Sequence, residues 1–381
     1  MESPFQLRLI ERLSDIDPHA WNAIAGPQVC VSHALLTTLE DTGCVGGQSG
    51  WHPCHVGLWR DDSLVAALPL YEKHHSYGEY VFDWAWADAY ARSGLAYYPK
   101  LLSAIPFTPI PGMRLLGTDD DARRALIAIA AELAQASEIS SLHILFPTDI
   151  EAQWMREAGF LIRQGVQFHW LNRGYGDFDA FLTSLNHDKR KKIRQERRRA
   201  TAHGLTLRWL DGHQATAADW SYFYGCYANT YALHRSTPYL TPDFFTALAR
   251  RAPESVRLLI ARRGAERVAS AFFLCDGKAL YGRYWGASEH LPFVHFELCY
   301  YQAIEYCIDH GLQRFEGGAQ GEHKLARGLE PTVTRSAHWI RDPRFRDAVD
   351  RHLARESAGM DFYLDELSER SPFRRTHTPL P

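Results

Sequence analysis

Three short stretches in the C-terminal half of the chain combine charged, aromatic and glycine residues at a spacing that could bind an anion and move a proton. The first is residues 280–288. Alternation along a strand places Tyr281, Arg283 and Trp285 on one face, and Tyr284 and Gly286 on the other. Arginine is rarely buried without a partner. The stretch therefore predicts either an anionic ligand or an arginine stacked between two aromatic rings.

The second stretch, residues 294–310, has helical spacing. At 100° per residue a polar face holds four residues: His295, Gln302, Glu305 and Asp309. Glu297 falls on the apolar face, where burial raises a carboxyl pKa and the first helical turn lowers it. Two interpretations remain: Glu297 is a general base that titrates near neutrality, or it forms a buried ion pair, for example with Arg283.

The third stretch, residues 315–328, follows a predicted strand that ends at Glu316. Its closely spaced glycines allow the backbone to approach a ligand or to bind an anion through N–H groups. Lys324 and Arg327 are three residues apart, so a helix would place them on one face, suited to phosphate or carboxylate. The alternative is a glycine-rich turn with a solvated charged tip. The candidate site residues are Glu316, Gly317, Gly318, Gln320, His323, Lys324 and Arg327.

Five side chains in these stretches are of the types that bind metal ions: His295, Glu297, Glu316, Glu322 and His323. Their spacing matches no familiar zinc signature, so we predict no metal site.

A strongly basic block occupies residues 189–199, where eight of the eleven side chains are Lys or Arg. Ile193 is the only large apolar residue among them, so a helix here would be almost entirely exposed. Such a helix favours an anionic partner, namely RNA, a cofactor phosphate or an anionic membrane surface. The alternative is a solvated helix paired with Glu196 and neighbouring acids. A nearby segment, residues 231–245, carries His234, Arg235, Tyr239 and Asp243 and is a candidate substrate-facing loop.

Composition limits the classes of protein that remain. The chain has 381 residues, a net charge of -3 and 46% hydrophobic residues, which is typical of a globular protein with two domains. Seven cysteines without a C-x-x-C pair favour a reducing compartment. No apolar run reaches the ~18 residues of a membrane span, and no signal-peptide pattern is present. We therefore expect a soluble cytoplasmic protein.

Hydrophobic periodicity predicts alternating strands and helices, which indicates an α/β fold with mixed sheets. We expect a hairpin over residues 55–71, helices near 122–137 and 149–158, and a strand at 160–171. In the second half we expect helices at 177–185, 219–232 and 242–250, a hairpin at 255–276, a strand at 278–286 and a strand at 312–316. After Gly328 we expect irregular chain and then a helix at 343–367. The domains are predicted as residues 1–172 and 173–381.

The strings LYGRYWG (280–286), HFELCYY (295–301) and GAQGEHKLARG (318–328) resemble the FemAB-like family of bacterial N-acyltransferases, of the peptidoglycan biosynthesis or recognition type. The strings FLTSLNHDKRKKIRQERRR (181–199) and PYLTPDFF (238–245) extend the resemblance over most of the chain. It implies two GNAT-like domains in tandem. It also implies transfer of an acyl or aminoacyl group, from acyl-CoA or aminoacyl-tRNA, to an amine such as that of a cell-wall precursor.

For such a reaction we assign the base to Glu297 or Glu316, with His295 or His323 as partners. Backbone N–H groups at Gly286 or at Gly317 and Gly318 would stabilise the oxyanion, and Arg283, Lys324 and Arg327 would hold anionic groups. Residues 283–288 come close to the GNAT pyrophosphate loop, but they end in Ser288 and are separated from the next helix by residues 289–293. The donor therefore stays open. The alternative function is a non-catalytic protein that binds RNA, a membrane surface or a cell-wall fragment on a degenerate acyltransferase fold.

Overall fold

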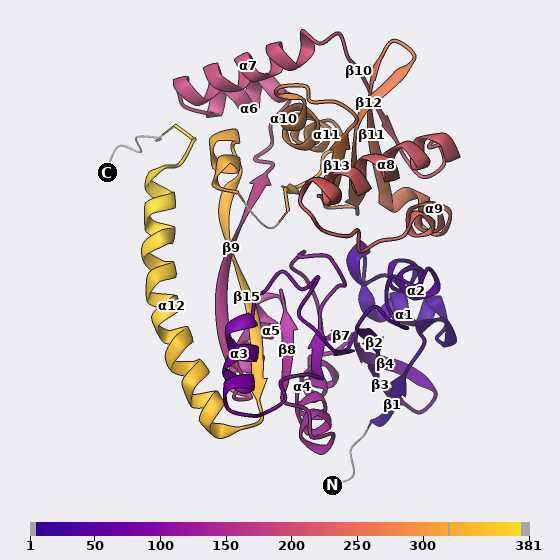
Figure 1. Ribbon diagram of the computed structural model, residues 1–381, viewed down its shortest axis with the longest axis vertical. Helices are drawn as coiled ribbons and strands as arrows, with labels where there is room; N and C mark the ends of the chain where they lie inside the picture. The colour runs from indigo at the N-terminus through magenta and orange to yellow at the C-terminus, as the bar shows by residue number, and fades with distance from the viewer. Residues whose placement is uncertain (1–4, 319–320, 375–381) are drawn as a thin grey trace. The chain divides into compact units, whose positions relative to one another are not determined.

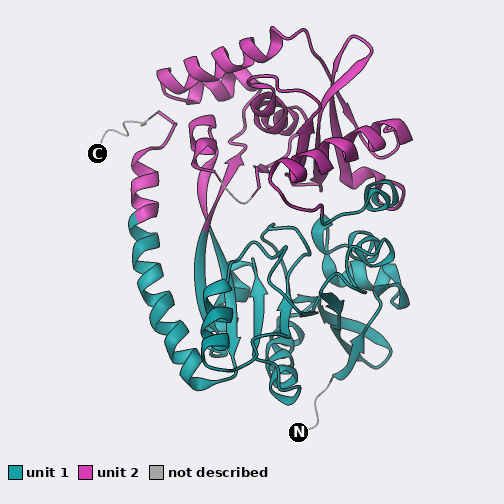
Figure 2. Ribbon diagram, in the orientation of Figure 1, with its two compact units in different colours: residues 1–165, 239–248, 333–362 teal, residues 166–238, 249–332, 363–381 magenta. Residues whose placement is uncertain are grey.

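The computed structural model describes residues 5–318 and 321–374 (Figure 1). The chain forms two units, shown in Figure 2. Unit 1 contains Met1–Gly165, Tyr239–Leu248 and Val333–Phe362, and unit 2 contains Val166–Pro238, Ala249–Thr332 and Tyr363–Pro381. This division differs from the predicted single boundary after residue 172. Strand β9 (Leu161–Leu171) runs across it without a linker, and β15 (Glu330–Ile340) brings the chain back into unit 1.

Unit 1 contains two sheets. The smaller has the strand order β1-β3-β4-β7, and the larger has the order β15-β8-β6-β5-β2 within this unit. The strands are β1 (Gln6–Ile10), β2 (Trp51–Pro53), β3 (His55–Arg60), β4 (Ser63–Leu68), β5 (Tyr71–Lys73), β6 (Lys100–Ser103), β7 (Leu116–Gly117) and β8 (Ser141–Leu145). The helices are α1 (Pro18–Ala25), α2 (His33–Asp41), α3 (Trp84–Arg92), α4 (Asp120–Ala136) and α5 (Asp149–Glu157).

The two faces of the larger sheet in unit 1 differ in chemistry. One face packs Leu101, Leu142 and Ile144 against apolar residues of α4 and α5, and forms an ordinary hydrophobic core. The other face carries buried polar side chains: Lys73, Lys100, His143 and His338. Trp86 of α3 covers part of this polar face, with its ring 4.9 Å from the ring of His338.

Unit 2 is built on the strand order β10-β11-β12-β13-β14-β9. Its strands are β10 (Thr206–Leu210), β11 (Val256–Arg263), β12 (Glu266–Cys275), β13 (Ala279–Ala287) and β14 (Arg314–Glu316). Its helices are α6 (Phe178–Ser184), α7 (His187–Thr201), α8 (Ala217–Leu233), α10 (Val294–Phe296) and α11 (Gln302–Asp309), with a π-helical turn at Glu297–Tyr301 and a 3-10 helix at Glu322–Arg327. Helices α9 (Pro242–Arg251) and α12 (Pro343–Glu369) contain residues of both units.

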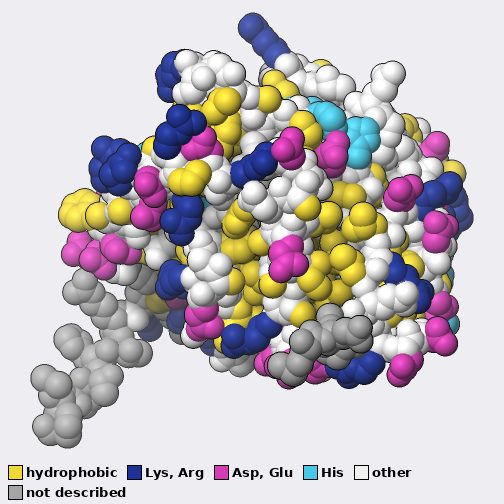
Figure 3. Space-filling view, turned by 90° about the horizontal axis from the view of Figure 1, so that it is seen from below, with side chains coloured by type: hydrophobic (Ala, Val, Ile, Leu, Met, Phe, Trp, Pro, Cys, Tyr) yellow, Lys and Arg dark blue, Asp and Glu magenta, His cyan; other side chains and the backbone are white. Residues whose placement is uncertain are grey.

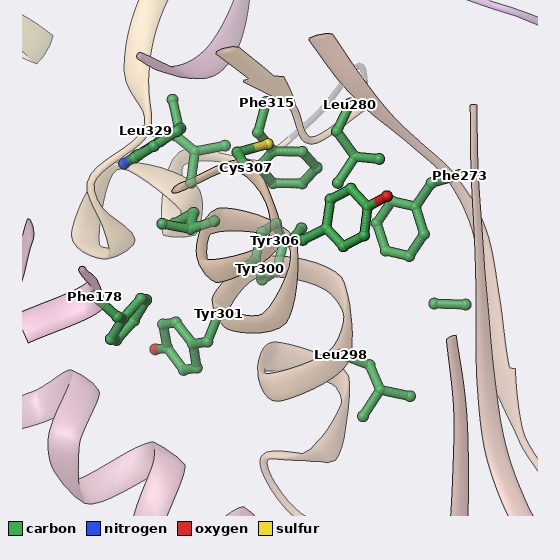
Figure 4. Packing of buried hydrophobic residues seen from close by; sticks show 14 of the residues in the cluster. Phe178, Phe273, Leu280, Leu298, Tyr300, Tyr301, Tyr306, Cys307, Phe315 and Leu329 are labelled. Atoms are coloured by element: carbon green, nitrogen blue, oxygen red, sulfur yellow. The ribbon is translucent and has the colours of Figure 1, made fainter. Parts of the chain in front are cut away.

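The core of unit 2 lies between the sheet and the helical segment from α10 to α11. Figure 4 shows Tyr300, Tyr306 and Cys307 of that segment beside Phe273 and Phe315 of the strands. On the opposite face of the sheet, α8 packs Phe223 against Phe272 of β12, with ring centroids 5.6 Å apart. The sheet of unit 2 is therefore covered by helices on both faces.

The expected mixed α/β fold is confirmed, and the predicted helices and strands all form within a few residues of their expected bounds. The chain after Gly328 was predicted wrongly as irregular, because it forms the eleven-residue strand β15. Every second residue of this strand is polar, namely Thr332, Thr334, Ser336 and His338, and His338 pairs with His143 on the buried polar face of the sheet. The strand therefore lacks the apolar alternation by which a half-buried strand is predicted.

Surface charge is mixed on the face shown in Figure 3, where side chains of both signs surround a central group of hydrophobic ones. In the part of the chain that the structure describes, no helix is long and apolar enough to cross a membrane.

Gly286 and Gly225 give a matched pair of stability predictions. A Cβ on Gly286 would overlap the carbonyl oxygen of Cys226, because α8 crosses β13 there at very short range. Gly225 lies on the exposed side of the same helix with open space around it. We expect Gly286→Ala to destabilise the protein by about 2 kcal/mol or more, and Gly225→Ala to stabilise it by up to about 1 kcal/mol. Thermal unfolding of both variants checks this, and equal melting temperatures would contradict the close packing of α8 on β13.

Candidate functional site at the divergence of two strands

Strands β13 and β14 run parallel for only three residue pairs, from Ala279 and Arg314 to Tyr281 and Glu316. Beyond that point β13 continues to Ala287, while β14 gives way to Gly317 and Gly318. The separation leaves a cavity of about 120 Å³ in the sheet. Its lining includes Gly282, Arg283, Tyr284, Trp285, His295, Cys299, Tyr300, Gly317 and Gly318. Six of the predicted site residues are thus brought together: Arg283, Tyr284, Trp285, His295, Gly317 and Gly318.

A β-bulge changes the face on which several of these side chains lie. The register between β12 and β13 shifts, so that Phe273 pairs with Gly282 while Phe272 pairs with Tyr284. Arg283 is the extra residue of the bulge. Simple alternation was therefore wrong, since Tyr281 and Trp285 do not share a face once one residue is inserted between them. The bulge turns Trp285 towards His295, with ring centroids 4.6 Å apart.

The π-helical turn at Glu297–Tyr301 makes a second correction. A π-helix bonds residue i to i+5, so it places on one side residues that an α-helix would separate. Gln302 donates to Glu297 Oε1 at 3.0 Å across this five-residue spacing. Glu297 therefore joins the polar face with Gln302 and Glu305, and His295 lies at the cavity instead. The α-helical spacing of 100° per residue had predicted the reverse, with His295 on the polar face and Glu297 on the apolar face.

Glu297 forms a buried ion pair, and its partner is Arg197 of α7 rather than Arg283. The Nη2 atom of Arg197 donates to Glu297 Oε1 at 2.9 Å and to Glu305 Oε2 at 2.7 Å. This arrangement directs the Glu297 carboxylate away from the cavity lining. Of the two interpretations drawn from the sequence, the contacts of Glu297 match the structural ion pair.

Glu316, the other predicted base, does not line the cavity itself but directly precedes the lining residues Gly317 and Gly318. It is the last residue of β14, buried, and its Oε1 accepts a hydrogen bond of 2.8 Å from Arg314 Nε. Its Oε2 has no hydrogen-bond partner within the described residues and lies 3.9 Å from His169 Nε2. Burial raises the pKa of Glu316 to about 7, although the positive charges of Arg314 and Arg283 oppose the rise.

His169 was not selected from the sequence. Burial and the nearby Arg314 lower its pKa to about 3, so it is neutral beside Glu316. Its Nε2 also contacts Gln167 Oε1 at 3.0 Å. A histidine within the alternating strand β9 gave no sequence signal, because strand pairing across 147 residues brings it to Glu316.

The glycine-rich stretch is arranged differently from the predicted anion site. Arg327 is buried and donates from Nη2 to both carboxylate oxygens of Glu196 in α7, at 3.1 and 3.0 Å. Lys324 is also buried, and its Nζ donates to the carbonyl oxygen of Gly318 at 2.8 Å. Burial lowers the pKa of Lys324 to about 8. Both cations therefore stabilise the loop from inside, and Gln320 lies outside the described residues.

Tyr300 and Cys299 line the cavity and were missed as site residues. The hydroxyl of Tyr300 lies 3.0 Å from His323 Nε2, which joins this histidine to the cavity through one hydrogen bond. Burial raises the pKa of Tyr300 and lowers that of His295 to about 4, so both are uncharged near neutral pH. The string HFELCYY contained these residues, but only the π-helical turn directs Tyr300 to the cavity.

Trp285 and His295 also line a second cavity of about 500 Å³, bounded by the C-terminal end of α8 and residues 288–293. The loop between β13 and α10 is thus longer than a direct strand-to-helix turn. It contains Glu289, which is paired with Arg263 at 3.0 Å. An acidic side chain at this place fits a pyrophosphate poorly. Gly286, expected to help an oxyanion, instead packs against Cys226 of α8.

The basic block forms helix α7, as predicted, but it is less exposed than expected. Ile193, Glu196 and Ala200 are buried, and Arg197 binds Glu297 and Glu305. A separate groove of about 700 Å³ lies between α6 and α7. Its lining holds the basic side chains Arg190, Lys191, Arg194, Arg197 and Arg198, and also the acidic side chains Asp177, Asp179 and Glu305. Within the described residues, Arg190, Lys191 and Arg198 have no acidic partner at ion-pair distance.

Comparison with known proteins places the chain in a family. Residues 12–375 match the model of the FemAB-like family, described as peptidoglycan biosynthesis/recognition. The chain belongs to this family. No curated protein sequence gives a significant match.

Solved structures support the fold of the FemAB-like chain. FemX matches with 12% identity and a TM-score of 0.53, over 91% of this chain and 100% of FemX. L-PGS from Bacillus licheniformis matches with 11% identity and a TM-score of 0.51, over 83% of this chain and 92% of that one. A conserved protein of unknown function from Bacteroides thetaiotaomicron matches with 11% identity and a TM-score of 0.54, over 88% and 100%. The chain therefore shares the fold of FemX and of these other solved structures, in agreement with the predicted mixed α/β fold.

No group of three or more His, Cys, Asp or Glu side chains suited to a metal ion occurs within residues 5–318 and 321–374. Three of the residues considered as metal ligands have other partners. His295 contacts the ring of Trp285, Glu297 is paired with Arg197, and Glu316 is paired with Arg314.

The buried carboxyl of Glu316 predicts a pH-dependent stability. Its pKa rises from 4.5 to about 7 on folding, so the folded state binds the proton more tightly. Stability should therefore fall as pH rises from 4.5 to 7. Glu316→Gln removes the charge, and we expect it to be more stable than the wild type at pH 8 by roughly 1–3 kcal/mol, with no gain at pH 4.5. Thermal unfolding at both pH values checks this.

Glu366→Gln, on an exposed part of α12, is the matched control and should alter stability equally little at both pH values. A Glu316→Gln variant that loses stability at pH 8 would show that the carboxylate form is the one the fold favours.

Proposed function

We propose that the FemAB-like chain transfers an acyl or aminoacyl group to an amine at the cavity between β13 and β14. The observation that carries this proposal is the position of Glu316. A buried carboxyl with a pKa of about 7 stands at the point where two parallel strands diverge and a cavity opens. Ligands of α/β proteins commonly bind at the carboxyl ends of strands, and this is such a place.

Glu316 would act as the general base. The acceptor amine is an ammonium ion at neutral pH, and it must lose a proton before its nitrogen attacks the acyl carbon. A base with a pKa near 7 is ionised in about half of the molecules at neutral pH, so it is available to accept that proton. Arg314 holds one carboxylate oxygen, and the buried Oε2 would receive the proton from the neighbouring cavity through a water.

Tyr300 would act as the general acid. When the tetrahedral intermediate collapses, the bond between the acyl carbon and the donor's sulfur or oxygen breaks, and the leaving group needs a proton. The neutral Tyr300 hydroxyl lines the cavity and can supply it, with His323 3.0 Å away to replace it. Backbone N–H groups at Gly317 and Gly318, which line the cavity, would stabilise the oxyanion.

Two donors fit the chemistry, acyl-CoA and aminoacyl-tRNA. Glu289 in the loop between β13 and α10 disfavours a pyrophosphate at that loop, whereas the groove along α7 offers Arg190, Lys191 and Arg198 to phosphates. These observations favour aminoacyl-tRNA. The family description supports a cell-wall precursor as acceptor. Both donors are made in the cytoplasm, which is where the proposal locates the protein.

The test is acyl transfer by Glu316→Gln and by its matched control Glu297→Gln, with each donor and a panel of amines including a cell-wall precursor. Loss of a general base should lower kcat by about 10²–10⁴-fold. Glu297→Gln leaves Arg197 paired with Glu305 and removes no proposed proton acceptor, so where it is folded its kcat should change by less than about threefold. Mass spectrometry of the acylated product is the readout.

Full activity in a folded Glu316→Gln variant would remove Glu316 from the base role. Activity that is lost equally in both variants would show that the loss reflects the fold rather than the base.

A second candidate function is binding of an anionic polymer or surface without catalysis, and the groove between α6 and α7 favours it. We expect tRNA binding to weaken steeply with salt, and the combined variant Arg190→Ala and Arg198→Ala to reduce both affinity and salt slope. Arg197 is left unchanged because it holds Glu297. Lys192→Ala is the matched control, since Lys192 is exposed on the same helix but does not line the groove.

Filter binding between about 50 and 200 mM salt measures the slopes. Equal affinity of all variants would exclude the groove as the binding site, and anionic vesicles in place of tRNA test the membrane alternative.

A further inference from the structure

The cavity of about 500 Å³ at the end of β13 has a size and a lining that the proton transfers proposed above do not use. It is bounded by the C-terminal end of α8, residues 288–293 and α10, all of which belong to unit 2 (Figure 2). Its volume falls within the range of about 300–1,000 Å³ that is usual for small-molecule sites. The cavity is therefore large enough to hold a ligand group of its own.

The lining of this cavity is rich in apolar side chains. Five large ones contribute to it: Leu233, Trp285, Leu291, Phe293 and Phe296. Among the described residues that line it there is no lysine or arginine, and the one acidic residue, Glu289, is paired with Arg263. Phosphate groups bind where cationic donors are available, whereas apolar groups bind where apolar side chains surround them. The lining therefore suits an apolar group.

Phe293 gives this cavity a fixed wall. Its backbone is left-handed with φ of 70°, which is uncommon for a bulky side chain. Its carbonyl oxygen accepts a hydrogen bond of 3.0 Å from the backbone N–H of Glu297, and the guanidinium of Arg199 lies over its ring, 5.2 Å from the centroid. A strained backbone that the surrounding contacts hold in place is typical of ligand-binding segments.

Trp285 and His295 line both this cavity and the smaller one between β13 and β14. Their ring centroids lie 4.6 Å apart. Burial lowers the pKa of His295 to about 4, so both rings are uncharged near neutral pH. Trp285 is also held through its carbonyl oxygen, which accepts a hydrogen bond of 2.9 Å from the Thr230 hydroxyl of α8. Two neutral rings thus border both cavities, and a ligand that occupies both passes beside them.

The smaller cavity has room for the reacting atoms alone. Its volume of about 120 Å³ equals that of about four water molecules in the liquid. In acyl transfer the acyl carbon, its oxygen, the attacking nitrogen and the leaving atom already fill such a volume. The rest of the transferred group therefore needs space elsewhere.

Of the groups that take part in the reaction, the side chain of the transferred group matches the larger cavity best. The leaving part of either donor, CoA or tRNA, carries phosphates and requires cations. The acceptor amine must approach Glu316, which pairs with Tyr281, and Trp285 lies about 13 Å further along β13 at the usual rise of a strand. The side chain of an acyl group needs neither a cation nor the base.

We propose that the cavity beside Trp285 and His295 binds the apolar side chain of the transferred group, so that the chain selects acyl or aminoacyl groups with a large branched or aromatic side chain. This inference rests on the acyl transfer proposed above and adds the class of the transferred group. A side chain of the size of leucine or phenylalanine leaves water when it enters the cavity, whereas a glycyl group leaves the cavity unfilled. One methylene group in an apolar pocket commonly changes selectivity by about tenfold or more.

The experiment is equilibrium binding of three aminoacyl amides that cannot act as donors, measured by ligand-observed NMR on the full-length protein. The probes are glycinamide, leucinamide and phenylalaninamide. We expect the wild type to bind leucinamide and phenylalaninamide at least about tenfold more tightly than glycinamide.

Two variants change the cavity. Ala287→Phe places a ring in it and should weaken phenylalaninamide binding by about tenfold or more. Its matched control is Ala232→Phe, on an exposed residue of α8 that does not line the cavity. Leu233→Ser makes the lining polar at a side chain that is 75% exposed, so the fold should tolerate it, and should weaken binding by about threefold. Leu9→Ser, at a leucine 53% exposed in unit 1, is its control. Both controls should bind as the wild type does.

Equal affinity of the wild type for the three amides would overturn the inference, as would equal binding by Ala287→Phe and Ala232→Phe. If Ala287→Phe does not fold, Leu233→Ser against Leu9→Ser decides it.

Transfer of glycyl, leucyl and phenylalanyl groups from one tRNA, and of the corresponding acyl groups from CoA, separates this inference from the proposed function. We expect kcat/KM to follow the order of amide binding. Transfer at equal kcat/KM for all groups would overturn the selectivity and leave the role of Glu316 intact. Selective amide binding without transfer from any donor would overturn acyl transfer and leave the cavity as a site for apolar side chains.

Discussion

The early end of pairing between β13 and β14 is the constraint on which the site of unit 2 depends. Parallel strands satisfy each other's backbone groups only while they stay side by side, and here they do so for three residue pairs. After Glu316 the chain turns at Gly317 and Gly318, whose backbone can approach the cavity because neither carries a side chain. The opening thus brings the bulged Arg283, the two glycines and the end of a buried strand to one small cavity.

Two local irregularities determine which side chains reach that volume, and ion pairs with α7 determine which do not. The bulge at Arg283 turns Trp285 towards His295, and the π-helical turn brings Tyr300 to the cavity. Meanwhile Arg197 binds Glu297, and Glu196 binds Arg327. Helix α7 thus holds two segments that border the cavity. Its Arg197 binds the π-helical turn at Glu297–Tyr301, and its Glu196 binds the 3-10 helix at Glu322–Arg327. Each pair has a further support, since Arg197 also binds Glu305 and Glu196 also accepts a hydrogen bond from the Tyr301 hydroxyl.

Much of this architecture could be predicted from the sequence, because hydrophobic periodicity and turn residues are local signals. The hairpins, the long helices and the basic helix were found in this way. The strand β15 was not, since its Thr, Ser and His residues pair with a polar sheet face rather than an apolar one. Nor could the faces of Tyr281 and Glu297 be predicted, because one inserted residue in a strand or in a helical turn changes the phase without changing the composition. The role of His169 depends on strand pairing over long sequence distance.

The proposed reaction depends on the carboxyl of Glu316, whose pKa burial raises to about 7 at the divergence of the two strands. The most direct measurement is a ¹³C NMR titration of the glutamate carboxyl carbons, with Glu316→Gln used to assign the resonance. The account predicts a midpoint near pH 7 for this carbon, as burial requires. A midpoint near 4.5, the ordinary value for glutamate, would contradict it.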